Sequence, residues 1–168
     1  HSLNPENPSM RGSHENGDIF FQHREACNRY YDELPATVEK YMEKVNAKIG
    51  TNYQLFNYYG APDAEHVIVS MGSVNDTIEE TIDYMVAQGQ KVGVVKVRLY
   101  RPFCADALVE AIPDTVKTIS VLDRTKEPGS LGEPLYLDVV AALRGTKFDQ
   151  VKILTGRYGL GSKDTTPA

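Results

Sequence analysis

The last two thirds of the chain alternates short apolar runs with helical segments, and this alternation constrains the fold more than any other feature. Four runs rich in β-branched residues are strand-like: 67–72, 92–100, 118–124 and 151–156. Between them, apolar residues recur at helical spacing over 76–89, 104–112 and 132–145. The order β-α-β-α-β-α-β predicts a mostly parallel sheet with right-handed crossovers and helices on both faces. We therefore predict an α/β fold of three layers, α/β/α.

A helical lead-in is predicted before the alternating region. Residues 19–34 and 36–50 carry apolar side chains at helical spacing, and Gly50 is suited to end the second helix. An aromatic strand and a set of turn-forming residues follow in YQLFNYYGAPDAE. These residues mark the boundary at which the alternating pattern begins.

The composition argues against several classes of function. The 168 residues carry a net charge of −5 with acidic and basic residues interspersed, so no cationic surface is expected for nucleic acid or an anionic membrane. No apolar stretch approaches the ~20 residues that span a bilayer, and the start lacks the features of a signal peptide. We expect a cytoplasmic protein that contacts neither nucleic acid nor membrane. The polar start without an initiator methionine predicts an internal piece of a longer protein.

Neither cysteine chemistry nor a hydrolytic triad is indicated. Cys27 and Cys104 lie far apart, so they give no disulfide framework and no metal cluster. None of the four histidines lies in a loop that follows a predicted strand, which argues against a Ser-His-Asp or Cys-His arrangement. Any ligand site is instead expected at the loops after the strands, because these loops line one edge of a parallel sheet.

Several of these loops carry charged or turn-forming residues. The helix start in MGSVND offers backbone N–H groups to an anion, but it fits no phosphate-binding motif, so an ordinary turn is favoured. Asp76 and Glu79 predict a capping box. Arg98 and Arg101 suit either an anionic ligand or a pairing with Asp123, and we favour the pairing. The long loop DRTKEPGSLGEP is predicted to line a cleft or an interface.

The chain ends in GRYGLGSKDTTPA, where three glycines stand among cations and hydroxyls. Such residues are typical of loops that hold phosphate groups. The stretch does not match the P-loop pattern, so a site that hydrolyses nucleotides is not expected.

The strand-end motifs resemble those of a known family, the pyruvate:ferredoxin (flavodoxin) oxidoreductases. They stand in YYGAPDAEHVIVSMGSVNDTIEETIDYMVAQGQKVGVVKVRLYRPF, in LDRTKEPGSLGEPLYLDVVAAL and in GRYGLGSKD. The resemblance is to the second domain of that enzyme, covers residues 53–168, and rests on loop motifs in the family's order and spacing. Residues 1–52 resemble the end of its first domain, which holds the pyrimidine side of thiamine diphosphate.

The resemblance implies a fold similar to the C-terminal domain of transketolase and a role as a core domain between subunits. The whole enzyme decarboxylates pyruvate on thiamine diphosphate with magnesium, passes electrons through 4Fe-4S clusters to ferredoxin or flavodoxin, and transfers the acetyl group to coenzyme A. It works as a homodimer. This chain lacks a cysteine cluster, a Gly-Asp-Gly motif and a matching catalytic glutamate. We therefore expect it to bind none of these cofactors and to be inactive alone.

Within this resemblance, Arg157, Ser162, Lys163 and Thr166 are candidate contacts for the phosphates of coenzyme A, since cations and hydroxyls on a glycine-supported turn suit a polyanion. A linker turn with glycines at positive φ is the alternative for this stretch. No catalytic residue and no metal ligand is expected. Two alternatives stay open for the whole chain. One is a stand-alone module that binds a nucleotide or anion through the MGSVND and RPF loops, and the other is the same domain of another 2-oxoacid oxidoreductase.

Overall fold

A five-stranded sheet is formed between residues 56 and 157. The structure is a computed structural model that describes residues 4–7, 14–161 and 163–167. The strands of the sheet are β1 (Phe56–Gly60), β2 (His66–Met71), β3 (Val92–Val97), β4 (Thr118–Asp123) and β5 (Lys152–Arg157). The order across the sheet is β1-β3-β2-β4-β5. β1 is antiparallel to β3, and the other pairs are parallel. The predicted α/β fold with a mostly parallel sheet is confirmed.

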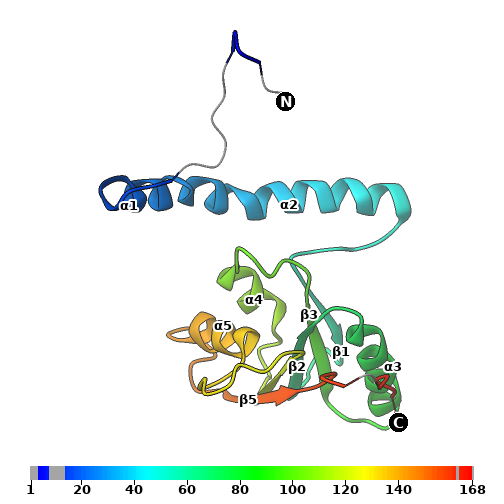
Figure 1. Ribbon diagram of the computed structural model, residues 1–168. Helices are drawn as coiled ribbons and strands as arrows, with labels where there is room; N and C mark the ends of the chain where they lie inside the picture. The colour runs from blue at the N-terminus through cyan, green and yellow to red at the C-terminus, as the bar shows by residue number, and fades with distance from the viewer. Residues whose placement is uncertain (1–3, 8–13, 162, 168) are drawn as a thin grey trace. The chain divides into compact units, whose positions relative to one another are not determined.

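Helices cover both faces of this sheet, as the apolar runs predict. α3 (Val74–Ala87) lies on one face, and α4 (Ala105–Ala111) and α5 (Pro134–Leu143) lie on the other (Figure 1). Successive residues of a strand point to opposite faces. Along β2, Val67 and Val69 therefore pack on the α4 and α5 side, and Ile68 packs on the α3 side. The three-layer arrangement follows from strands that are apolar on both faces.

The element ends differ from the predicted ones by a few residues. α3 begins earlier than expected, and the strand-like run from 92 to 100 leaves the sheet after Val97. The expected stops at Gly89 and Gly145 are confirmed, because these glycines follow α3 and α5 with φ of +78° and +74°. Positive φ at the end of a helix is the conformation that favours glycine.

Two helices precede the sheet, but the break between them is not where it was predicted. They are α1 (Gly17–Ala26) and α2 (Asn28–Ile49), and Pro35 lies inside α2. A break at Pro35 is therefore wrong. Proline inside a helix deprives the carbonyl four residues earlier of its donor, and here that residue is the exposed Tyr31, where water can take the donor's place. Gly50 ends α2 as expected, with φ of +73°.

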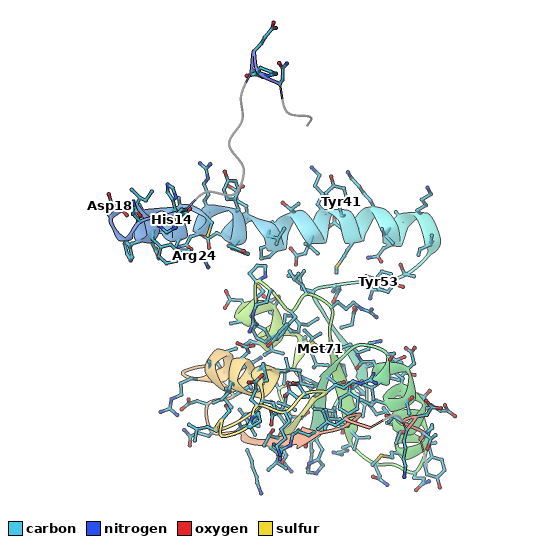
Figure 2. All side chains as sticks on the ribbon, in the orientation of Figure 1. His14, Asp18, Arg24, Tyr41, Tyr53 and Met71 are labelled. Carbon is cyan, nitrogen blue, oxygen red and sulfur yellow. The ribbon has the colours of Figure 1, made fainter. Side chains whose placement is uncertain are left out.

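The chain divides into two compact units, His1–Leu34 and Pro35–Ala168. The first contains α1 and the start of α2, with side chains such as Asp18 and Arg24 exposed on α1 (Figure 2). The second contains the rest of α2 and the whole sheet. The expected domain boundary between residues 52 and 53 concerns the resemblance to other proteins, and it stays a prediction.

Leu135→Ala is expected to lower the free energy of unfolding by about 2–5 kcal/mol, because the substitution leaves a cavity between α5 and the sheet. Leu135 is 0% exposed, whereas Leu137 on the same helix is 41% exposed. Leu137→Ala is the matched control and should change the free energy by less than about 1 kcal/mol. Urea denaturation followed by circular dichroism measures both, and equal effects would contradict the assigned helix faces.

Candidate functional site

The loops after β2 and β4 diverge at the carboxyl edge of the sheet. β2 leads into α3 on one face, whereas its neighbour β4 leads into α5 on the other face. In open α/β sheets, ligands bind in the crevice where two such loops part. The fold itself therefore makes this edge the candidate site.

Tyr158 of the same chain lies across this crevice. Its N–H donates to the main-chain oxygen of Asp123 at 3.1 Å, and its hydroxyl donates to that of Met71, labelled in Figure 2, at 3.4 Å. The ring packs against the core on the α3 side. Burial raises the pKa of the Tyr158 hydroxyl, so it stays a neutral donor at physiological pH. A side chain that joins both strand ends thus bridges the crevice.

Asp123 is buried at the end of β4, with 1% of its surface exposed. Its carboxylate accepts the N–H of Leu135 at 2.9 Å and the N–H of Tyr136 at 3.2 Å, near the start of α5. Burial raises the pKa of Asp123, and these two hydrogen bonds oppose the rise. The carboxylate satisfies donors that the first turn of a helix leaves without partners, so its role is structural.

The favoured pairing of Arg98 and Arg101 with Asp123 is wrong. Arg98 Nε donates to Asn57 Oδ1 at 2.7 Å, and Arg101 Nη2 donates to Asp138 Oδ2 at 2.7 Å. The physical reason is that backbone donors of α5 already occupy both oxygens of Asp123. Each arginine instead ties the end of β3 to a neighbouring element, Arg98 to β1 and Arg101 to α5.

The turn after β2 is held by its own side chains. Ser70 Oγ donates to Asn75 Oδ1 at 2.6 Å, and Asn75 Nδ2 donates to the main-chain oxygen of Gly72 at 2.9 Å. Gly72 has φ of +85°, a conformation that favours glycine. These contacts agree with the interpretation of an ordinary strand-to-helix turn.

The predicted capping box at Asp76 and Glu79 is wrong. α3 begins at Val74, and its N-cap residue Ser73 makes no side-chain cap hydrogen bond. Glu79 forms an ion pair with Lys96 of β3, whose side chain is only 15% exposed. A largely buried ammonium group needs a carboxylate partner, and this need outweighs the small gain of a cap.

The long loop after β4 is closed by a buried carboxylate that sequence analysis missed. Glu133 is 2% exposed and accepts the N–H of Glu127 at 2.6 Å and a hydrogen bond from Arg157 Nη1 at 2.8 Å. Burial alone raises the pKa of Glu133, but the Glu127 N–H and the Arg157 guanidinium outweigh it and hold the pKa below its ordinary value. A glutamate directly before Pro134 at a helix start was the only sequence signal for this role.

The structure does not bring the candidate residues for coenzyme A together. Arg157 is paired with Glu133 on the α5 side, and half of its side chain is exposed. Thr166 lies beside α3 on the opposite face, where it lines a groove. Lys163 is exposed in the tail between them. Ser162 lies outside the described residues.

Metal ligands are not clustered in the part of the chain that the structure describes. There, no group of three or more His, Cys, Asp or Glu side chains could hold a metal ion, and Cys27 and Cys104 are both free thiols. Among the same residues, no helix is both long enough and apolar enough to cross a membrane.

Residues 64–168 match the family described as pyruvate:ferredoxin oxidoreductase core domain II. The chain belongs to this family. Core domain II begins just before β2, so the match contains the whole parallel part of the sheet together with Asp123, Glu133 and Tyr158. β1 and the helices before it lie outside the matched residues.

Relatives resemble the chain from end to end, but they are much longer. It is 54% identical over 167 residues both to the pyruvate-flavodoxin oxidoreductase of Enterobacter agglomerans and to the pyruvate:ferredoxin oxidoreductase of Moorella thermoacetica. Each match covers 99% of this chain and 14% of the relative. The mitochondrial pyruvate dehydrogenase (NADP(+)) of Euglena gracilis is 50% identical over 167 residues, which are 99% of this chain and 9% of that protein.

A solved structure also aligns with part of the chain. The 2-oxoglutarate:ferredoxin oxidoreductase from Magnetococcus marinus aligns with 73% of this chain, which corresponds to 19% of that chain. The sequence identity is 19% and the TM-score is 0.45.

Arg157→Met is expected to destabilise core domain II at pH 7 but much less in acid. The pKa of folded Glu133 lies below its ordinary value of 4.5. Glu133 therefore contributes stability above pH 4.5, and this contribution is lost as the pH falls through the folded-state pKa. Urea denaturation at a series of pH values, from 7 down to the lowest pH at which the unsubstituted chain stays folded, compares the variant with that chain. Lys163→Met, at an exposed lysine, is the control. A pH-independent difference for Arg157→Met would contradict the assigned ion pair.

Proposed function

We propose that the chain is the core domain II portion of a pyruvate:ferredoxin or pyruvate:flavodoxin oxidoreductase, in which it serves as a structural domain between other parts of the enzyme. The observation that carries the proposal is its 54% identity, over nearly its whole length, to two pyruvate oxidoreductases. The whole protein then oxidatively decarboxylates pyruvate to acetyl-coenzyme A and passes electrons to ferredoxin or flavodoxin.

The structural role is supported by what occupies the candidate site. Tyr158 bridges the crevice in which a doubly wound sheet usually binds its ligands. Both carboxylate oxygens of Asp123 accept backbone N–H groups at the start of α5. Arg98 and Arg101 are likewise engaged by Asn57 and Asp138. A stand-alone module that binds anions is therefore less well supported than a structural domain, because these cations already have protein partners.

The described residues do not fit the cofactors of the whole enzyme. Iron–sulfur clusters need a set of cysteine thiolates, whereas this chain has two cysteines at distant positions. A magnesium ion needs several oxygen ligands, and the described residues provide no such carboxylate group. In the proposed assignment, thiamine diphosphate, magnesium and the 4Fe-4S clusters are bound by other parts of the longer polypeptide.

Residues 1–52 complete the preceding domain, which holds the pyrimidine side of thiamine diphosphate, and residues 53–168 form the core domain. The whole protein is a homodimer in the cytoplasm, where it docks ferredoxin or flavodoxin. This chain covers only 14% of the length of each of these two relatives, which supports contacts with other domains of the same polypeptide.

Pyruvate oxidation is expected in the longer polypeptide and not in this chain alone. Both are incubated with pyruvate, coenzyme A, thiamine diphosphate and magnesium, and reduction of a viologen dye measures electron release. The longer polypeptide is tested with 2-oxoglutarate as well. Preference for 2-oxoglutarate would contradict the assignment to pyruvate, and pyruvate oxidation by the chain of 168 residues would contradict its structural role.

Contact with coenzyme A is the proposed role of the tail, and it fits the described residues only in part. Lys163 is exposed and Thr166 lies in the same segment, but Arg157 is engaged by Glu133. Within the proposal, Lys163 is therefore the main contact with the phosphates, and Arg157, Ser162 and Thr166 are weaker contributors.

In the longer enzyme, Lys163→Ala is expected to weaken coenzyme A binding by about 1 kcal/mol or more, roughly fivefold or above, because a charge-assisted hydrogen bond to phosphate is lost. The KM for coenzyme A and a direct titration measure the effect. Lys48→Ala, at an exposed lysine of α2, is the matched control. Unchanged affinity in Lys163→Ala would leave the tail as a linker turn.

A further inference from the structure

α3 covers only part of its face of the sheet. It packs chiefly on β1, β3 and β2, and no other described helix of the second unit lies on that face. The register pairs Ser120 with Leu154 and Leu122 with Gly156, while the neighbours Ile119 and Ile153 pack on the opposite side. We call the surface on the α3 side of β4 and β5 the open face. It consists of Thr118, Ser120, Leu122, Lys152, Leu154 and Gly156.

The open face carries two large apolar side chains, Leu122 and Leu154. Leu154 is 41% exposed, and Leu122 beside it is partly exposed. Lys152 is its only charged residue. Antiparallel sheets often leave one face in water, but parallel strands such as β4 and β5 are normally covered on both faces. The open face therefore lacks a layer that this type of sheet usually has.

A groove of about 300 Å³ runs beside α3 and reaches the open face at Ser120. Thr77, Thr81 and Met85 of α3 form one wall, and Ile68 and Ser120 of the sheet form the floor. Most of the lining is apolar, so the groove suits apolar side chains from a further element packed beside α3. A helix is the element that parallel sheets place in this position.

The tail of the chain enters this groove. Thr77 Oγ1 donates to the main-chain oxygen of Thr165 at 3.4 Å, and Thr165 and Thr166 line the groove. Threonine suits the N-cap of a helix, and proline suits its first position, so Thr166 and Pro167 have the pattern of a helix start. Residues that follow Pro167 in a longer polypeptide therefore begin at the groove.

We propose that the open face binds an amphipathic helix formed by the residues that follow Pro167 in the longer polypeptide. This inference rests on the proposed function, since it needs a polypeptide of the relatives' length, of which this chain spans 14%. The apolar side of the helix fills the groove beside α3 and extends from there over Leu154. An acidic side chain at its edge pairs with Lys152. A second copy of the chain is the poorer occupant, because packing two open faces together would bury two Lys152 ammonium groups without partners.

Cysteine labelling at Leu154 tests the proposal. Leu154→Cys is prepared in the chain of 168 residues, in the same chain extended by about twenty residues of its own reading frame, which is about 30 Å of helix, and in the full-length enzyme. Maleimide reaction rates are measured by peptide-resolved mass spectrometry, which separates this site from Cys27 and Cys104. Leu131→Cys, in a loop and 97% exposed, is the matched control for reactivity.

We expect labelling of Leu154→Cys to be at least about tenfold slower in the extended chain than in the chain of 168 residues, with Leu131→Cys unchanged between these two. Equal labelling in the two chains would overturn the proposal, as would protection that appears only in the full-length enzyme, where another domain would then cover the face. Protection that rises with concentration in the shorter chain would assign the face to a second copy. Because pyruvate oxidation is measured separately, an active enzyme with an unprotected Leu154→Cys would reject this inference and leave the proposed function standing.

Discussion

The buried carboxylate of Asp123 joins three parts of the fold. Its two oxygens accept N–H groups of Leu135 and Tyr136 at the start of α5, while its main-chain oxygen accepts the N–H of Tyr158 in the tail. Without the carboxylate, the buried N–H of Leu135 and the partly buried N–H of Tyr136 would lose their partners, at about 1–3 kcal/mol for a buried unsatisfied group. The position of α5 against β4 therefore depends on the Asp123 side chain, whereas the tail is held by the main-chain oxygen of the same residue.

A second buried carboxylate stands beside the first, and its charge requires a cation. Glu133 adds to the rise in the pKa of Asp123, so two carboxylates in this small space are stable only with enough donors around them. Arg157 supplies the missing charge, and the Glu127 N–H supplies a further donor. Because Arg157 is needed there, less of its guanidinium is available to a ligand. The same two contacts join the long loop after β4 to the start of α5 and to the end of β5.

The alternation of strands and helices could be predicted because the pattern of apolar residues within each segment indicates its secondary structure. Val67 to Val69 form an apolar run without polar alternation, and such a run predicts a strand buried on both faces. Pairing between distant residues could not be predicted. Arg101 reaches Asp138, and Glu79 reaches Lys96, through contacts that exist only after the elements have packed. The sequence offers several acidic residues as possible partners for each cation. Which of them forms the ion pair depends on which charges become buried together when the elements pack.

By itself, the sequence determined the α/β class and the number of parallel strands, because hydrophobic periodicity depends on residues that are close together in the chain. It also determined the resemblance to the family, which the match to residues 64–168 confirms, because the loop motifs are short local patterns. Only the tertiary structure decided which face each side chain occupies. Arg157 and Thr166 stand close together in the glycine-rich tail, yet they lie on opposite faces of the sheet, since side chains alternate along β5 and the tail then crosses to α3. The open face is likewise decided by the tertiary structure. The sequence shows that Leu154 is apolar, but its exposure depends on which strands α3 covers.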